Sequence, residues 1–157
     1  MTAGAAASMI ISALLGSASG MTHELTSSDT LLRSPLALSR RIGFVQLRGG
    51  SGASATAGYV ASMLARRRTG MVLAVNASAG ETNLLWQAGL TRSAARGARN
   101  ALSRAHPASA ADARAGLPMT GTGLIALDLA RDHLAVGAGT WFEQVTPIAR
   151  FYDLVIT

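Results

Sequence analysis

The chain has 157 residues, of which 49% are hydrophobic and 4% aromatic, and it carries a formal net charge of +6. This length and composition are typical of one globular domain and exclude a disordered chain, while the absence of cysteine excludes disulfides and thiolate metal sites. The basic residues are all arginine and are dispersed along the chain, which favours a solvated surface.

Residues 1–39 come before the first regular pattern. The apolar stretch from Ala5 to Leu15 is too short to span a bilayer. A secretory signal begins with basic residues, and the first basic residue here is Arg33. We therefore expect 1–39 to be a poorly ordered extension, 40–157 to form the domain, and the protein to be cytoplasmic or peripheral to the membrane.

The next segment has the pattern of a strand, a glycine-rich loop, a helix and a second strand. The strands are predicted at Ile42–Leu47 and Met71–Asn76, because both runs are apolar and bounded by turn residues. Between them, apolar residues recur at helical spacing up to Arg67, and Gly70 ends the helix. A βαβ crossover of this kind predicts an α/β fold with a parallel sheet.

The remaining elements are less regular. A short helix is predicted within Ala79–Gly89, and short strands at Leu124–Leu129 and Leu134–Val136. Pro147 limits a helix within Trp141–Arg150. Phe151–Thr157 is a strand by composition, so we expect the chain to stop inside the sheet, with Leu154, Val155 and Ile156 at an exposed edge. One more feature is a row of arginines on one helical face, which could meet DNA phosphates or anionic lipid: Arg92, Arg96 and Arg99.

The glycine-rich loop is the main candidate site. Glycines permit positive φ angles, and the backbone N–H groups of such a loop and of the following helix converge on an anion. A lysine that reaches the outer phosphates is missing, because the chain has no lysine. The candidate residues are Arg48, Gly49, Gly50, Ser51, Gly52, Ala53, Ser54 and Ala55.

This loop resembles the deviant Walker A loop of MinD/ParA-like P-loop ATPases, which reads K-G-G-x-G-K-[ST]-[ST]. Arg48 stands at the first lysine, Ala53 replaces the second, and Ser54 matches the hydroxyl residue that meets Mg²⁺. Asn76 stands where the family has an acidic residue, and the run Tyr152–Thr157 resembles the Walker B strand, ending before its aspartate. The resemblance implies a three-layer α/β/α P-loop NTPase-like domain, truncated at the Walker B strand.

The G-G-x-G-A-S form of the loop looks most like TadZ/CpaE-type pilus-assembly and septum-site proteins. For those proteins, positioning rather than hydrolysis is the implied role. We therefore expect a pseudo-ATPase that binds ATP and Mg²⁺ weakly or not at all. The same resemblance implies a homodimer and a protein partner at the membrane or cell pole.

Other interpretations of the loop stay open. An active ATPase could use Arg48 together with a carboxylate outside this chain. The stretch Gly50–Ala55 also fits the G-x-G-x-x-[GA] pattern of nicotinamide dinucleotide sites, although Asn76 ends the second strand where an acid would bind the ribose. A glycine turn that binds nothing is the third alternative. The scattered histidines predict no metal site, and Ser51 and Ser54 have no nearby base for nucleophilic catalysis.

Overall fold

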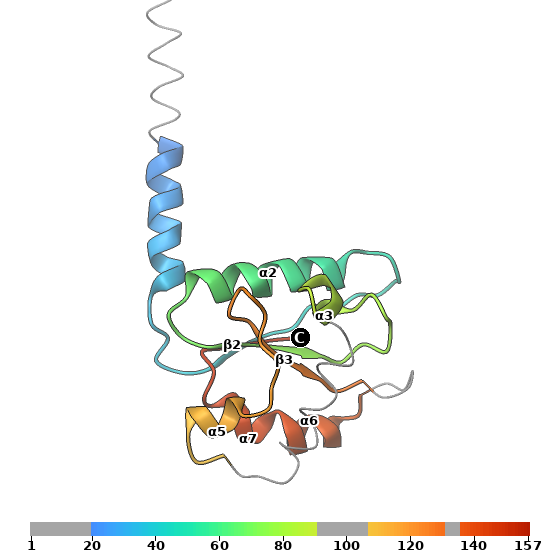
Figure 1. The fold of residues 1–157 in the computed structure, drawn as a ribbon. Coiled ribbons are helices and arrows are strands. Elements are labelled where there is room, and N and C mark those ends of the chain that lie inside the picture. The colour runs from blue at the N-terminus through green and yellow to red at the C-terminus, as the bar shows by residue number, and fades with distance from the viewer. Residues whose placement is uncertain (1–19, 91–106, 131–135) are drawn as a thin grey trace, which may run out of the picture. The chain divides into compact units, whose positions relative to one another are not determined.

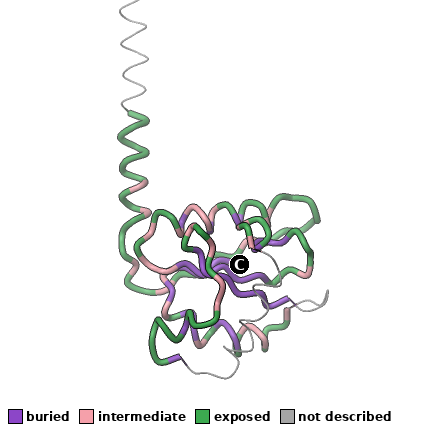
Figure 2. The backbone as a smooth tube through the Cα atoms, in the orientation of Figure 1, coloured by how far each residue is buried: buried purple, intermediate pink, exposed green. Residues whose placement is uncertain are grey.

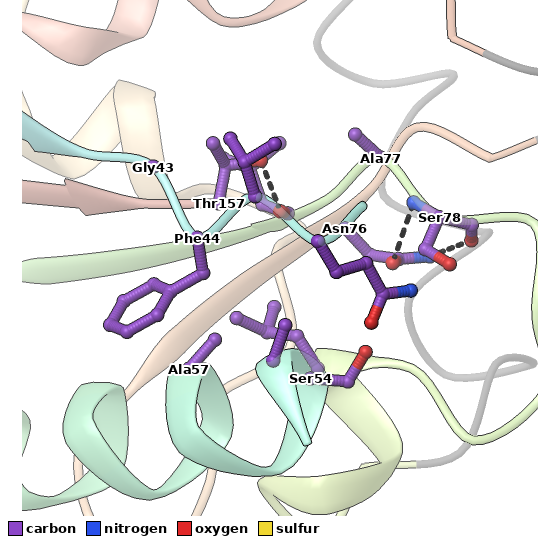
Figure 3. A pocket seen from close by; sticks show the side chains of 13 residues that line it. Gly43, Phe44, Ser54, Ala57, Asn76, Ala77, Ser78 and Thr157 are labelled. Atoms are coloured by element: carbon purple, nitrogen blue, oxygen red, sulfur yellow. Dashed lines mark hydrogen bonds between the residues drawn. The ribbon is translucent and has the colours of Figure 1, made fainter. Parts of the chain in front are cut away.

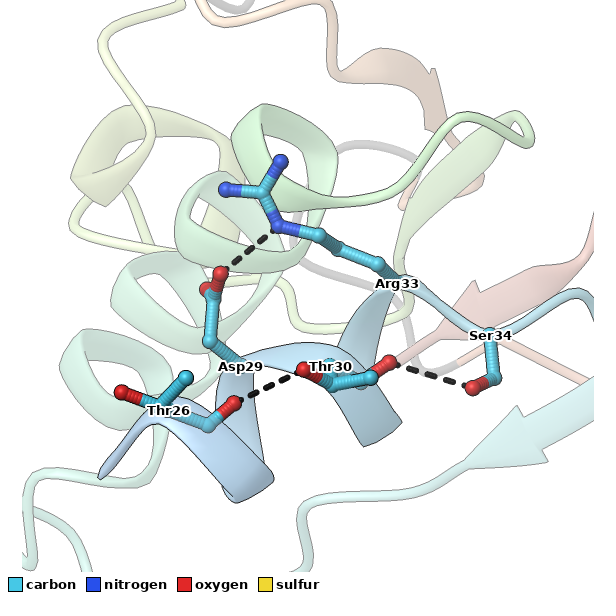
Figure 4. Close-up of polar contacts among 5 residues, drawn as sticks. All are labelled: Thr26, Asp29, Thr30, Arg33 and Ser34. Carbon is cyan, nitrogen blue, oxygen red and sulfur yellow. Dashed lines mark hydrogen bonds and ion pairs between the residues drawn. The ribbon is translucent and has the colours of Figure 1, made fainter. Parts of the chain in front are cut away.

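The computed structural model describes residues 20–90, 107–130 and 136–157, in two compact units, Met1–Ser34 and Pro35–Thr157. In the first unit, residues 20–33 are helical. Threonine and serine hydroxyls there bond to carbonyls four residues earlier, and Arg33 Nε donates to Asp29 Oδ2 at 2.7 Å (Figure 4). An i,i+4 ion pair of this kind contributes about 0.3–0.5 kcal/mol to helix stability. Poor order over 1–39 stays a prediction.

The second unit contains a four-stranded sheet in the order β1-β4-β2-β3, and all three strand pairs are parallel. The strands are β1 (Arg40–Ile42), β2 (Val72–Asn76), β3 (Ile125–Asp128) and β4 (Leu154–Ile156). The predicted parallel sheet is therefore confirmed, as are a second strand ending at Asn76 and a terminal strand beside the first. The structure bears out an α/β fold in general.

The first strand lies earlier than the sequence predicts. It covers Arg40–Ile42 and is exposed, whereas a buried strand was expected at Ile42–Leu47. The cause is its register with β4: Arg40 pairs with Leu154, and the Phe44 N–H donates to the Thr157 carbonyl at 2.6 Å. Hydrogen bonding to the β4 segment therefore ends at Phe44, and the apolar residues that follow form an exposed loop.

Helices cover both faces of the sheet (Figure 1). On one face lie α2 (Ala53–Arg67) and α3 (Leu84–Gln87), and on the other lie α5 (Ala110–Arg114), α6 (Ala138–Gln144) and α7 (Thr146–Ala149). The described helices and the sheet thus form three layers. Helix α2 begins at Ala53, directly after the glycine-rich loop, and its buried residues are Ala57, Gly58, Ala61 and Leu64.

The core follows the inner strands. Every residue of β2, β3 and β4 is buried, as the purple path through the middle of Figure 2 shows. Strands with helices on both faces carry apolar side chains at consecutive positions, and the runs in β2 and β4 follow this rule. Tyr152 is buried beneath this layer and its hydroxyl donates to the Ala113 carbonyl at 2.9 Å, which joins the segment before β4 to α5.

The position of β4 in the sheet contradicts a second expectation. Because the chain stops within this strand, the sequence predicted that Leu154, Val155 and Ile156 would form an exposed edge. Instead β4 lies between β1 and β2 and is paired on both sides. The edge strands are β1 and β3, and β3 is joined on its outer side by an antiparallel bridge between Ile125 and Met119.

Candidate functional site

A hollow of about 350 Å³ lies at the carboxyl ends of β1, β2 and β4, beside the first turns of α2. Its wall contains residues that follow the strands, such as Phe44, Ala77 and Thr157, and residues that begin α2, Ala53 and Ser54. In Figure 3, Ser54 and Ala57 point from α2 toward the strand ends, and Phe44 points from the loop toward α2. The carboxyl edge of a parallel sheet is the usual place for a ligand in α/β folds.

The glycine-rich loop leads directly into this hollow. Gly50 has a φ of 80° and Gly52 a φ of 82°, a backbone conformation that favours glycine. Gly52 is the N-cap of α2 and supplies no side-chain cap, so the first N–H groups of α2 have no intrahelical partner. Gly49 is different, because its φ is not in the left-handed region and a Cβ built there would meet nothing within 4 Å.

The predicted site residues divide into two groups. Ala53 and Ser54 line the hollow, together with Gln46, whose Oε1 accepts a hydrogen bond of 3.2 Å from the exposed Ser51 hydroxyl. Arg48 is exposed and is not among the lining residues. The other predicted residues, Gly49, Gly50, Gly52 and Ala55, form the loop and first turn without lining the hollow.

A buried polar pair lies at the neighbouring strand ends, where the sequence predicted only Asn76. Asn76 and Asp128 occupy matched positions in the register of β2 and β3, and they are 1% and 0% exposed. Asn76 Nδ2 donates to Asp128 Oδ1 at 2.7 Å. Asp128 Oδ1 also accepts from the Ala130 N–H at 3.1 Å. An acid directly after an apolar run is the signal that could have identified Asp128.

These contacts fix the Asn76 amide. Its Nδ2 also donates to the Ser78 carbonyl at 2.9 Å, and its Oδ1 accepts from the Ser78 N–H at 3.0 Å. Both amide donors are therefore used within the protein, and the amide orientation is set by its two acceptors. Asn76 lines the hollow but serves to hold the Ala77–Ser78 turn rather than to offer a hydrogen bond to a ligand.

The described side chains in the wall of the hollow are uncharged. Among the described residues, no arginine, histidine, aspartate or glutamate lines it. Likewise, no group of three or more potential metal-ligating side chains occurs in the described part of the chain. The hydroxyl of Ser54 is thus placed at the hollow with no described aspartate or glutamate side chain in the same wall.

Several predicted features lie elsewhere. Arg92, Arg96 and Arg99 fall within 91–106 and lie outside the described residues, as do His106 and His133. Of the strand expected at Leu134–Val136, the structure describes Val136, which is not in a strand. Trp86 is exposed on α3, whereas Trp141 packs against the core. Among the residues that the structure describes, no helix is long and apolar enough to cross a membrane.

Comparison with known proteins adds no relative to this description. No protein-family model, curated protein or solved structure matches the chain.

Proposed function

We propose that this protein is a MinD/ParA-like positioning or scaffolding protein that binds a nucleotide weakly in the hollow beside α2 and does not hydrolyse it. The observation that carries the proposal is that, among the residues the structure describes, no charged side chain lines that hollow at the carboxyl edge of the parallel sheet. Phosphoryl transfer depends on charged groups that hold and neutralise the transferred phosphate. A site that keeps the loop and lacks those charges favours binding over turnover.

The residues of the hollow suit the base and sugar of a nucleotide better than its magnesium-bound triphosphate. Phe44, Val75 and Leu84 give the hollow apolar surface for a base or sugar, and the uncapped N-terminus of α2 offers N–H groups for an anion. A magnesium triphosphate fits less well. Ser54 could supply one hydroxyl ligand, but no aspartate or glutamate side chain of the described residues lines the wall beside it.

The other interpretations gain no support from this geometry. An active ATPase that relies on Arg48 needs that guanidinium at the ligand, and Arg48 is exposed outside the wall of the hollow. A nicotinamide dinucleotide site needs an acid at the end of β2, where Asn76 is held by Asp128 and Ser78. Binding without hydrolysis therefore remains the function that the site supports best.

Calorimetric titration with ATP, with and without Mg²⁺, tests the proposal when it is combined with a phosphate-release assay. We expect weak ATP binding, little dependence on Mg²⁺ and no phosphate release above background. Ala53→Phe should abolish binding by filling the hollow. Ala55→Phe, on the exposed side of the same helical turn, is the matched control and should leave binding unchanged.

Two results would contradict the proposal. Hydrolysis by the unaltered protein at a rate typical of the resembling ATPases would show that the missing charges are dispensable. Absence of ATP binding, or equal binding by the Ala53→Phe variant, would show that the hollow is not a nucleotide site.

A further inference from the structure

Apolar side chains form much of the buried wall of the hollow beside α2. Ala57, Val75 and Leu84 line the hollow and are buried. Asn76 is also buried there, but its amide makes its hydrogen bonds within the protein. Moving a charged phosphate group against such a surface costs free energy, because nothing replaces the water that it loses. This part of the wall therefore accepts apolar or aromatic atoms of a ligand.

Phe44 gives the hollow an aromatic face. The residue is half-buried, and its side chain points from the loop toward α2, where Ala57 lies (Figure 3). On the α2 side, the lining residues Ala53 and Ala57 carry only a methyl group, so the hollow stays open beside the ring. A flat ring of a ligand can stack on Phe44 in this space. Such stacking is favourable for every nucleobase, since each has a π face.

Gln46 supplies a polar group that a base can use. Its side chain lines the hollow, and its Oε1 accepts a hydrogen bond of 3.2 Å from the Ser51 hydroxyl. That contact orients the amide and leaves the two N–H groups of Nε2 as donors. Nucleobases carry ring-nitrogen or carbonyl acceptors along their edges. An amide donor in a largely apolar wall is therefore suited to a base, whereas a triphosphate is bound best by cations.

The glycine-rich loop brings no cationic side chain into the wall. Arg48 is exposed and does not line the hollow, and the chain has no lysine. The β- and γ-phosphates of a nucleotide held here would thus meet no cationic side chain that the structure describes. Their contribution to affinity should be small, because strong phosphate binding depends on charge-assisted hydrogen bonds.

We propose that the hollow is a purine nucleoside site, in which the base stacks on Phe44 and the outer phosphates extend away without specific contacts. The ligand class is a purine nucleoside and its phosphate esters, recognised by the base. Such a site does not distinguish ATP from ADP or AMP, so nucleotide hydrolysis cannot switch the protein between states. This inference rests on the proposed nucleotide binding and names the part of the nucleotide that is recognised.

Calorimetric titration with adenosine, AMP, ATP and inorganic triphosphate tests the site. We expect AMP and ATP to bind equally, within about twofold. Adenosine should be weaker than AMP by at most about fivefold, the size of the attraction between one phosphate and a helix N-terminus. Inorganic triphosphate should show no binding at the same concentrations, because it lacks the base.

Two substitutions locate the base. Phe44→Leu removes the ring and should weaken adenosine about tenfold, the usual size of a base–aromatic stack. Its matched control is Phe142→Leu, since Phe142 is exposed on α6 and does not line the hollow. Gln46→Glu keeps an acceptor for the Ser51 hydroxyl but loses the Nε2 donors, and it should weaken the uncharged adenosine about fivefold. Gln87→Glu, on α3 outside the wall, is its control. Circular dichroism monitors the fold of each variant.

The outcomes separate this inference from the proposed function. If ATP binds while adenosine does not, or if inorganic triphosphate binds as tightly as ATP, the inference fails and nucleotide binding stands. If neither ATP nor adenosine binds, the proposed function fails as well. Equal adenosine affinity in Phe44→Leu and Phe142→Leu would show that the base does not stack on Phe44, which would also overturn the inference.

Discussion

At the scale of single residues, Ala53 is the position where the chemistry of the hollow is most easily changed. It begins α2 and lines the hollow, where the resembling family has a lysine. Ala53→Lys would place an ammonium group there, and we expect ATP affinity to rise by about 1–3 kcal/mol, the strength of a charge-assisted hydrogen bond. Isothermal titration calorimetry measures this gain. Ala55→Lys is the control, because it adds the same charge on the exposed side of the turn.

Hydrolysis should not return in the Ala53→Lys variant. Asn76 stays in place of an acid, and no carboxylate lines the hollow among the described residues. If calorimetry detects no ATP binding even with the added lysine, the loop is not a recoverable nucleotide site.

Asn76→Asp restores the acid of the resembling family but conflicts with this structure. The new carboxylate would replace an amide that donates to Asp128 Oδ1 at 2.7 Å, and two buried carboxylates would then face each other. We expect the free energy of unfolding to fall by about 1–3 kcal/mol near pH 7. Two carboxylates this close share a proton more readily than one alone, so the deficit should shrink as the pH falls toward about 5.

Urea unfolding of this variant and the unaltered protein at both pH values gives the comparison. Asn76→Ala is the control, since it loses the same hydrogen bonds without adding charge, and its deficit should not shrink in the same way. Equal stability of Asn76→Asp and the unaltered protein at pH 7 would mean that the Asn76–Asp128 contact is not formed.

At the scale of elements, the packing of α2 on α3 depends on Gly58. A Cβ at this position would lie 2.6 Å from Gln87 Cβ and 3.0 Å from the Leu84 carbonyl oxygen. Gly58→Ala improves helix propensity by about 1 kcal/mol, but the overlap costs more, and we expect a net loss of about 1–2 kcal/mol in unfolding free energy. Thermal unfolding measures it. Gly49→Ala, where the added Cβ meets nothing, should be close to neutral.

The contact between Tyr152 and α5 has a pH dependence of its own. Burial raises the pKa of Tyr152 well above that of an ordinary tyrosine, and the nearby Arg114 guanidinium opposes this in part. The neutral hydroxyl is therefore favoured in the folded state. The contribution of Tyr152 to stability is intact below about pH 10 and is lost as the pH rises above it. Tyr152→Phe should lower stability by about 1 kcal/mol at neutral pH and remove this alkaline component.

Denaturant unfolding at several pH values between neutral and about 11 measures both effects. Tyr59→Phe is the matched control, because Tyr59 is 73% exposed on α2 and should change neither the stability nor its pH dependence. If the loss of stability at alkaline pH persists in Tyr152→Phe, it arises from groups other than Tyr152.

At the scale of the whole molecule, the net charge of +6 favours attraction to polyanions such as DNA. Binding to them stays a prediction. If Arg92, Arg96 and Arg99 contact DNA phosphates, replacing all three by alanine should weaken binding. The slope of log affinity against log salt should then flatten by nearly three units. A salt titration followed by anisotropy measures the slope, and vesicles of anionic lipid are the parallel probe. Unchanged DNA and vesicle binding in the triple variant would assign these arginines to the solvated surface.

A structural feature of this protein could be predicted from the sequence where residues close together in the chain decide it. Apolar runs predicted β2, β3 and β4, and helical spacing predicted α2, because burial in a covered parallel sheet leaves a pattern in each segment. The place of β1 could not be predicted, since its register is decided by Leu154–Ile156. The same holds for the Asn76–Asp128 contact, which exists because β2 and β3 are neighbours. Pairings between distant segments leave no local pattern.

The central place of β4 has a consequence for how the protein is made. During translation β1 leaves the ribosome before every other strand described here, yet its partner in the sheet is β4, which leaves after them. β2 can pair with β3 before β4 is synthesised. Until then, the apolar Ile42–Leu47 segment of the nascent chain has no β4 to pair with. Nascent chains with such segments are substrates for chaperones. Closure of the sheet at β1 therefore comes after the synthesis of β4, and amide protection in β1 should be the last to develop in a pulse-labelling experiment.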